Sequence, residues 1–532
     1  MSGNPQKNQK VEVSFDPSLA LPIMLEQHLH NQPQAVALIQ GDTTRTWEES
    51  IHRIYQMANG LIELGIERGD RVALLSRNSM AYSELFAAVL ISGGCAVPLQ
   101  SMISDQSLKL MLEDSSAKVL VIGEEMAPMA EPFLHQQTQI IAGGLMGFDF
   151  ENDKFANFES WLQVQTKNAP GIVLDPDDEF NIIYSSGTTG VPKGIVHSHR
   201  TRQALAVALM VMGFNSEAMN LVSTPLYSNT TITTWWPSLC AGTPQIISEK
   251  FDAERALALI QKHKVTHAML VPVQYDRIMR LENYHDYDLS SLQVKFSTSA
   301  PLRAALKADI IERFPGELLE FYGLTEGGVT CLFIGSVALA ADKLGSVGQP
   351  SAGCTLKILD EAGTELGSGE IGEIVGRSGS MSNGYLNRED ANLEMHWYDS
   401  EGSLFYRSGD AGYLDEDGWL FLSDRRKDMI ISGGFNIYAT DLELVLLEHE
   451  EVHEVAVVAL PSSDWGETPL AIVVTEVGST VDEESLRIWA NAKLGKLQRI
   501  SKVVYADDLP KSSIGKVLKK ELRERYAALA DA

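Results

Sequence analysis

Short apolar runs alternate with helical patterns between about residues 71 and 323, and this alternation constrains the fold more than any other feature. Residues 71–76 suit a buried strand, whereas residues 83–92 have a helical pattern. The chain has 532 residues, which is too long for one ordinary hydrophobic core. Strands that alternate with helices are typical of parallel sheets covered by helices, so the sequence predicts an α/β fold with more than one domain.

The alternation comes in two successive sets, which indicates two α/β subdomains. In the first set we expect strands at 71–76 and 118–123 around a helix at 83–92. In the second set we expect strands at 181–184, 221–225, 266–272, 294–297 and 318–322, and helices at 201–212, 253–263 and 303–314.

The pattern changes near residue 343, where glycines and short alternating strands predict a small β-rich subdomain that extends to about residue 422. Beyond residue 425 the pattern predicts a compact α+β domain. Its helices are expected at 440–449, 483–494 and 517–529, and its strands at 452–459, 469–475 and 502–505. We therefore expect a large N-terminal domain over residues 1–426, followed by a small mobile domain over residues 427–532.

The net charge of the chain limits its partners. The formal charge is −28 at pH 7, which argues against a broad nucleic-acid surface because such a surface needs clustered Lys and Arg. A site for an anionic substrate must then be locally basic or contain a metal ion.

The cysteines and the apolar runs indicate a cytoplasmic protein. Cys95, Cys240, Cys331 and Cys354 are scattered and form no CxxC pair, which favours reduced thiols over zinc ligands or disulfides. Residues 1–11 lack the apolar core of a signal peptide, and no apolar run approaches the length of a membrane span. The oligomeric state stays open, with a homodimer as one option.

The loop at residues 185–194 is the clearest candidate for binding phosphate. It reads Ser-Ser-Gly-Thr-Thr-Gly-Val-Pro-Lys-Gly, and the sequence pattern places it after an apolar strand and before a helix. Its glycines allow close approach of a ligand to the backbone, and its hydroxyls and amides are donors. Lys193 adds a positive charge. The spacing is not that of a Walker A loop, and the alternative is a solvated turn.

A second candidate segment lies at residues 320–326, at the end of an expected strand. It reads Glu-Phe-Tyr-Gly-Leu-Thr-Glu. Ligands of open α/β sheets collect at the carboxyl ends of strands, and a carboxylate there can hold Mg²⁺. The alternative is a strand-end turn with a solvated glutamate.

Three further charged segments complete the set of candidates. Asp410 could accept hydrogen bonds from both hydroxyls of a ribose, and Arg425 could donate to the same sugar or to phosphate. Residues 510–516 place Lys516 on a glycine-containing turn before the last expected helix. Each of these residues could equally belong to a surface ion pair or a solvated basic face.

These segments occur together in an order that resembles the adenylate-forming superfamily of acyl-CoA synthetases, peptide-synthetase adenylation domains and firefly luciferase. The motifs are residues 185–194, 322–326, 408–410, 424–436 and 511–516, and the resemblance covers about residues 37–526. Five ordered motifs favour a common function over separate surface features.

The resemblance implies a role for each matching position. The loop would hold the phosphates of ATP through Ser185, Ser186, Gly187, Thr188, Thr189, Gly190 and Lys193. Tyr322 and Gly323 would lie at adenine, Glu320 would accept from its amine, and Ser299 and Ala300 would also lie at the nucleotide. Asp410 and Arg425 would bind the ribose.

The resemblance also implies the reacting groups. Thr325 would contact the α-phosphate, Glu326 would bind Mg²⁺, and Lys516 would bridge the carboxylate and the α-phosphate. Lys427 would be the hinge of the small domain. Gly433 and Gly434 would reach the tunnel for coenzyme A.

The chain departs from common family patterns at the expected acyl pocket. It has Ser228 where many acyl-CoA synthetases have a histidine, and Thr298-Ser299 where two glycines are common. The pocket would be formed by Tyr227, Ser228, Thr230, Thr234, Trp235 and Thr298. Side chains that replace glycines should narrow it, which favours a medium-chain or aryl acid over a long fatty acid.

The sequence therefore predicts an ATP-dependent acid–CoA ligase. A carboxylate and ATP would give acyl-AMP and pyrophosphate, and the thiol of coenzyme A would then displace AMP. The alternative is a stand-alone adenylation enzyme that transfers the acyl group to a carrier protein or an amine. A non-catalytic relative or an oxygenating luciferase is a more distant alternative.

Overall fold

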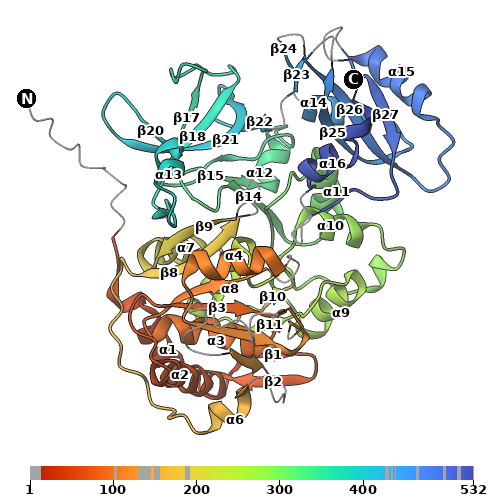
Figure 1. Ribbon diagram of the computed structural model, residues 1–532. Coiled ribbons are helices and arrows are strands. Elements are labelled where there is room, and N and C mark those ends of the chain that lie inside the picture. The colour runs from red at the N-terminus through yellow and green to blue at the C-terminus, as the bar shows by residue number, and fades with distance from the viewer. Residues whose placement is uncertain are drawn as a thin grey trace, which may run out of the picture. The chain divides into compact units, whose positions relative to one another are not determined.

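The computed structural model describes residues 14–100, 105–126, 128–129, 145–148, 156–185, 192–425, 430–432, 435–437, 439–462, 466–494, 499–511 and 517–530. The chain forms two compact units. The first comprises residues 1–344, 351–355 and 377–406, and the second comprises residues 345–350, 356–376 and 407–532. Figure 1 labels many of their helices and strands.

One sheet of the first unit contains the strands around the expected phosphate loop. Its order is β19-β9-β8-β4-β3-β5-β6-β7. The strands are β3 (Arg71–Leu75), β4 (Cys95–Pro98), β5 (Val119–Gly123), β6 (Leu145–Phe148), β7 (Ala156–Asn157), β8 (Glu179–Ser185), β9 (Lys193–Ser198) and β19 (Gly384–Tyr385). The pairs from β8 to β7 are parallel, and β9 is antiparallel to both β8 and β19.

A second sheet of the first unit has the order β15-β14-β13-β12-β10-β11-β1-β2. These strands are β1 (Val36–Gln40), β2 (Thr43–Thr46), β10 (Asn220–Val222), β11 (Gln245–Ile247), β12 (His267–Met269), β13 (Val294–Ser297), β14 (Glu317–Gly323) and β15 (Thr330–Ile334). The strands from β1 to β14 are parallel, and β2 and β15 are antiparallel to their neighbours.

Helices cover these two sheets. They are α1 (Leu21–Asn31), α2 (Trp47–Glu63), α3 (Met80–Ile91), α4 (Asp105–Ser115), α6 (Phe158–Gln163), α7 (His199–Met210), α8 (Asn229–Ala241), α9 (Ala253–His263), α10 (Pro272–Met279), α11 (Ala304–Arg313), α12 (Gly335–Ala340) and α13 (Glu389–Met395). Figure 1 shows α1, α2 and α3, coloured red to orange, gathered beside the sheets, where these helices pack on one another. The unit also contains β20 (His396–Tyr398) and the beginning of β21.

Helix α3 shows why this core holds together. Every residue of α3 is buried, as expected of a helix that is apolar on all sides. Its one acidic residue, Glu84, accepts hydrogen bonds from Ser50 and from Arg45 and Arg53, and Arg53 also pairs with Glu159. The buried carboxylate is therefore neutralised by charges from β2 and α2.

The second unit contains the remaining β-rich strands and the C-terminal α+β set. The first group is β17 (Thr355–Leu359), β18 (Gly372–Arg377), β21 (Leu404–Leu414) and β22 (Leu420–Arg425), and β22 is antiparallel to β21. A second sheet has the order β24-β23-β26-β25, with β27 beside β26. Its elements are β23 (Ile430–Ser432), β24 (Phe435–Ile437), α14 (Ala439–Leu447), β25 (Val452–Ser462), β26 (Gly466–Thr475), α15 (Glu483–Lys493), β27 (Lys502–Tyr505) and α16 (Lys519–Arg525).

The α/β fold class is confirmed, but two local expectations are wrong. The strand expected at 181–184 belongs to the sheet of the first set, because β8 pairs with β4. The loop at 185–194 does not lead directly into a helix, because it joins the antiparallel strands β8 and β9 and α7 begins only at His199. The boundary at residues 426 and 427 stays a prediction.

We expect Glu84→Gln to destabilise the first unit by about 3 kcal/mol, because two guanidinium groups would lose a buried counter-charge. The midpoint of urea denaturation, followed by tryptophan fluorescence, measures this loss. Glu113→Gln is the matched control, since its ion pair with Lys109 is exposed and should contribute less than about 1 kcal/mol. Equal midpoints for the two variants would contradict the role of Glu84.

Candidate active site

The segment Thr325–Glu326 follows β14 and is held by hydrogen bonds from two directions. The backbone oxygen of Thr325 accepts from Nε2 of His197 on β9 at 2.7 Å. Oε1 of Glu326 accepts from the hydroxyl of Tyr385 on β19 at 2.6 Å. The two strands thus fix both the backbone and the carboxylate of this segment.

Tyr385 also contacts Lys193, which connects this lysine to the segment Thr325–Glu326. The Nζ atom of Lys193 lies 5.0 Å from the centre of the Tyr385 ring, a cation–π contact. Burial raises the pKa of the Tyr385 hydroxyl, and the nearby carboxylate of Glu326 raises it further, so the hydroxyl keeps its proton and donates. A lysine at the end of the phosphate loop and a carboxylate after β14 therefore share one tyrosine.

The backbone around Glu326 is closely packed. The backbone oxygen of Glu326 accepts from the N–H of Ser382 at 2.8 Å. Gly327 has φ +76°, and a Cβ there would lie 2.0 Å from the backbone oxygen of Ser380. This position can therefore hold only glycine without a backbone shift.

One carboxylate is a suitable donor for Mg²⁺ that is bound mainly through phosphates. Mg²⁺ usually keeps several water molecules and takes one or two protein carboxylates. Among the residues that the structure describes, no group of three or more His, Cys, Asp or Glu side chains could form an all-protein metal site. Glu326 fits the simpler arrangement.

Glu320 occupies a different environment from the one expected for an adenine contact. It lies on β14 and is 3% exposed. Its Oε2 lies 2.6 Å from Nζ of Lys307 on α11, and that ammonium also lies 3.9 Å from the centre of the Phe333 ring. Burial raises the pKa of Glu320, partly offset by Lys307. The contact favours a role in holding β14 to α11, and the adenine contact of Glu320 stays a prediction.

The expected adenine residues follow on the same strand. Tyr322 is half-buried and lies opposite Cys331 in the register of β14 and β15, and Gly323 is exposed. A Cβ on Gly323 would lie 2.6 Å from the backbone oxygen of Val329. The backbone of Val329 therefore approaches Gly323 more closely than a side chain would allow, and the adenine roles of Tyr322 and Gly323 stay predictions.

Two segments of the expected acyl pocket meet at Thr230 and Ser299. Their hydroxyls form a hydrogen bond between the first turn of α8 and the segment after β13. Ser299 has φ +80°, which is uncommon for a residue with a side chain and costs about 1–3 kcal/mol. Thr298 and Ala300 beside it are half-buried. The narrowing of the pocket stays a prediction.

The other expected pocket residues are buried. Tyr227, Ser228 and Thr234 are each less than a tenth exposed. Trp235 is fully buried, donates from Nε1 to the hydroxyl of Ser83 at 2.7 Å and packs on Phe86. These contacts favour a packing role for Trp235 over contact with a substrate.

The expected ribose residues lie opposite each other in the second unit. Asp410 on β21 and Arg425 on β22 are register partners in the antiparallel pair. Asp410 is buried, and its backbone N–H donates to the hydroxyl of Ser408. The pairing brings the two backbone positions together, and their role at a ribose stays a prediction.

Several predicted residues lie outside the described residues. They are Ser186, Gly187, Thr188, Thr189, Gly190, Lys427, Gly433, Gly434 and Lys516, together with the side chains of Ser185 and Arg425. Their assigned roles stay predictions. Sequence reasoning also missed His197, Tyr385 and Lys307, whose contacts cross between elements that are distant in the chain.

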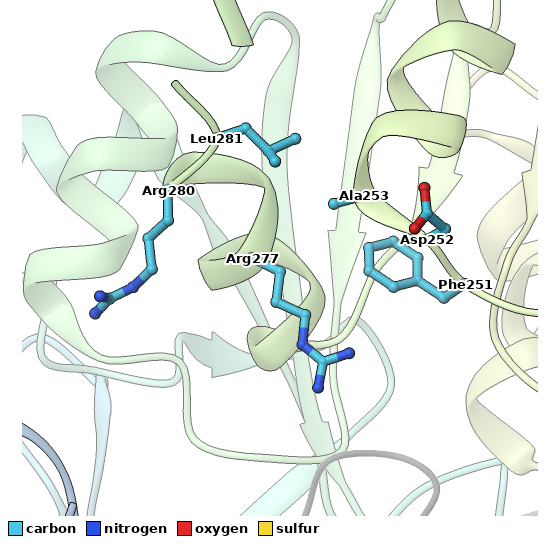
Figure 2. Close-up of a pocket in the computed structure, with 6 residues that line it drawn as sticks. All are labelled: Phe251, Asp252, Ala253, Arg277, Arg280 and Leu281. Atoms are coloured by element: carbon cyan, nitrogen blue, oxygen red, sulfur yellow. The ribbon is translucent and has the colours of Figure 1, made fainter. Parts of the chain in front are cut away.

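A pocket of about 390 Å³ lies elsewhere in the first unit, between the start of α9 and the end of α10. It is lined by Phe251, Asp252, Ala253, Arg277, Arg280 and Leu281. Figure 2 shows these side chains. Asp252 caps α9, and Arg280 pairs with Asp276 one turn away. The pocket contains none of the residues predicted for ATP or the acid.

Comparison with known proteins identifies the family. Residues 25–386 match the family described as AMP-binding enzyme, and residues 441–516 match the AMP-binding enzyme C-terminal domain. The chain belongs to the AMP-binding enzyme family. The predicted resemblance to adenylate-forming enzymes is therefore confirmed.

Named relatives of this AMP-binding enzyme cover nearly its whole length. It is 32% identical to feruloyl-CoA synthase of an Amycolatopsis species over 497 residues, which cover 93% of this chain and 96% of the relative. It is 30% identical to the long-chain-fatty-acid–CoA ligase FadD13 of Mycobacterium tuberculosis, with 95% and 98% covered. It is also similar to the ATP-bound structure of MatB from Rhodopseudomonas palustris, with a TM-score of 0.85, 26% identity and 96% and 99% of the chains covered.

Within the AMP-binding enzyme, we expect Tyr385→Phe to lower the rate of adenylation roughly 10-fold to 100-fold. The variant keeps the ring beside Lys193 but removes a hydrogen bond to a charged group, which typically contributes ~1.5–3 kcal/mol. Pyrophosphate exchange into ATP at several Mg²⁺ concentrations measures the effect.

Tyr398→Phe is the control, because Tyr398 lies on β20 and is 44% exposed. Its exchange rate should match that of the unchanged protein. A normal rate for Tyr385→Phe would show that Glu326 does not need this hydrogen bond.

Proposed function

We propose that this AMP-binding enzyme is an ATP-dependent acid–CoA ligase. A carboxylate oxygen attacks the α-phosphorus of ATP, and pyrophosphate leaves. The sulfur of coenzyme A then attacks the acyl carbon, and the bond to the bridging oxygen breaks to release AMP. The contacts of Tyr385 carry this proposal. Its ring lies against Lys193 and its hydroxyl donates to Glu326, which joins the phosphate loop to the carboxylate expected at the nucleotide.

The first step brings together anions, so the protein must supply positive charge and fixed donors. Lys193 lies at the end of the phosphate loop and is positioned over Tyr385. The resemblance adds Lys516, which would bridge the carboxylate and the α-phosphate. Donors that are already oriented stabilise charge in the transition state without reorganisation.

Glu326 would hold Mg²⁺, which lowers the negative charge of the phosphates when it is bound. The hydrogen bond from Tyr385 fixes one carboxylate oxygen in place. His197 fixes the backbone of Thr325, whose side chain would contact the α-phosphate. Tyr385 and His197 would therefore contribute by orienting Glu326 and Thr325.

The small domain would serve both steps. We place its boundary between residues 426 and 427, with Lys427 as the hinge. Residues 25–386 and 441–516 match the two family domains, and the proposed boundary lies between these matches. Rotation about such a hinge would exchange Lys516 for Gly433 and Gly434, which would line the tunnel for coenzyme A.

The acid is proposed to be of medium length or aromatic. The side chains at Thr298, Ser299 and Thr230 occupy the expected pocket where less bulky residues would leave room for a longer chain. The similarity to a feruloyl-CoA synthase supports an aryl acid. The similarity to a long-chain-fatty-acid ligase supports a role in fatty acid metabolism as the other option.

A cytoplasmic location is proposed from the cysteines. Cys95, Cys240, Cys331 and Cys354 are all free thiols, which is typical of reducing compartments. No helix in the described part of the chain has the length and apolar character needed to cross a membrane. A homodimer stays a prediction.

We expect Lys516→Ala to abolish pyrophosphate exchange but to leave thioester formation from a supplied acyl-adenylate largely intact. Loss of one oriented donor of this kind costs about 10²–10³ in rate. Lys520→Ala is the control, since Lys520 is exposed on α16 and its ion pair with Glu524 is long, at 3.9 Å. Equal loss of both half-reactions would contradict the role assigned to Lys516.

The acceptor is tested with a panel of carboxylic acids assayed for AMP release with and without coenzyme A. A ligase should release AMP steadily only when the thiol is present. Steady release with an amine or a carrier protein, and none with coenzyme A, would favour the stand-alone adenylation enzyme instead.

A further inference from the structure

A buried arginine lies one hydrogen bond from the expected acyl pocket. Arg202 is on the first turn of α7 and is 3% exposed. Its Nη1 donates to Oδ1 of Asn229, the first residue of α8, at 2.8 Å. Asn229 lies between Ser228 and Thr230, both of which are assigned to the pocket. The guanidinium is therefore fixed against the segment that should receive the acid.

A chain of hydrogen bonds connects the same guanidinium to Thr325. Nε of Arg202 donates to Oδ1 of Asn181 on β8 at 2.9 Å, and Nδ2 of Asn181 lies 3.5 Å from Nδ1 of His197. His197 donates from Nε2 to the Thr325 oxygen, so its Nδ1 is the acceptor. Burial and the charge of Arg202 hold the pKa of His197 well below its usual range, which keeps this arrangement.

The remaining nitrogen of Arg202 has no hydrogen-bond partner among the described residues. Nη2 is buried and forms no hydrogen bond with any residue that the structure describes. Burial lowers the pKa of Arg202 to about 9, with no carboxylate acting against this shift. The group is still charged at neutral pH, and both of its partners are neutral amides.

A buried charge without a counter-ion is costly, on the order of several kcal/mol, and is rare in proteins. Arg200 in the same helix is half-buried by contrast, and its charge is paired with Asp177. Arg202 is one of several buried residues at the start of α7, and its charge has no counter-ion among the described residues. An anion that enters the acyl pocket would supply the missing partner.

We propose that the carboxylic acid substrate carries a second carboxylate, and that Nη2 of Arg202 binds it. The reacting carboxylate would lie toward Thr325 and the second toward Asn229. This inference rests on the proposed function and specifies its substrate as a dicarboxylic acid. Guanidinium groups bind carboxylates with strong, directional hydrogen bonds, so the match also sets the orientation of the acid.

The test compares acids in matched pairs that differ only in the second carboxylate, such as hexanoate with hexanedioate and benzoate with benzene-1,4-dicarboxylate. AMP release that depends on ATP and coenzyme A gives kcat/KM for each acid. We expect at least one dicarboxylate to exceed its monocarboxylate by 10-fold or more.

Arg202→Met, which keeps an unbranched side chain without the charge, should lower kcat/KM for that dicarboxylate at least 100-fold. It should leave the matched monocarboxylate within about 3-fold. Arg200→Met is the control and should change neither acid, because Arg200 is 30% exposed and paired with Asp177. Retained turnover of the monocarboxylate shows that Arg202→Met is folded.

If Arg202→Met does not fold, Asn229→Asp provides a second variant. It places a carboxylate beside Nη1 with little change in shape, so it should neutralise Arg202 and selectively weaken the dicarboxylate. Parallel losses for all acids, or no preference for any dicarboxylate in the unchanged protein, would overturn the assignment. Failure to release AMP with any acid would instead refute the proposed function and this inference with it.

Discussion

Electrostatic repulsion is the constraint on which the active site depends. The reaction brings a carboxylate to a polyphosphate inside a protein whose formal charge is already −28. Two like charges 4 Å apart repel by about 4 kcal/mol at the effective dielectric of a protein surface. The first unit offers positive charge locally, with the ammonium of Lys193 beside Tyr385 at the end of the expected phosphate loop.

Hydrogen bonds between distant strands then fix the groups that must act together. His197 and Tyr385 come from strands β9 and β19, and they hold consecutive residues after β14. β9 and β19 are neighbours in one sheet of the first unit, whereas β14 belongs to the other sheet. The segment Thr325–Glu326 is thus held by residues of both sheets, which would limit its movement if charge develops nearby.

The bounds of helices and strands were easier to predict from the sequence than the strands they pair with. The helix at 253–263 and the strands at 294–297 and 502–505 were predicted with the observed bounds, because their apolar periodicity is local. The sheet that β8 joins could not be predicted in this way, since a buried strand gives no sign of its neighbour. Strand β9 was missed because its first two residues fall in the expected phosphate loop, and the remaining residues before the helix expected at 201–212 were assigned no element.

The same limit applies to the side chains of the site. The motif around Glu326 marks this residue as a candidate in the sequence, whereas its hydrogen bond to Tyr385 joins residues 59 positions apart. The ion pair of Glu320 with Lys307 and the unpaired nitrogen of Arg202 arise only when α11, α7 and α8 are packed. Trp235 is a large aromatic residue within the segment expected to form the acyl pocket. Only its hydrogen bond to Ser83 reveals that it lies in the core.

The most direct test of acyl-adenylate chemistry is the fate of a carboxylate oxygen. An acid labelled with ¹⁸O in its reacting carboxylate is converted with ATP and coenzyme A, and the released AMP is analysed by mass spectrometry. Attack on the α-phosphorus predicts one labelled oxygen in each AMP, since the carbon–oxygen bond breaks in the second step. Unlabelled AMP, with the label in inorganic phosphate or retained in the acid, would contradict the account.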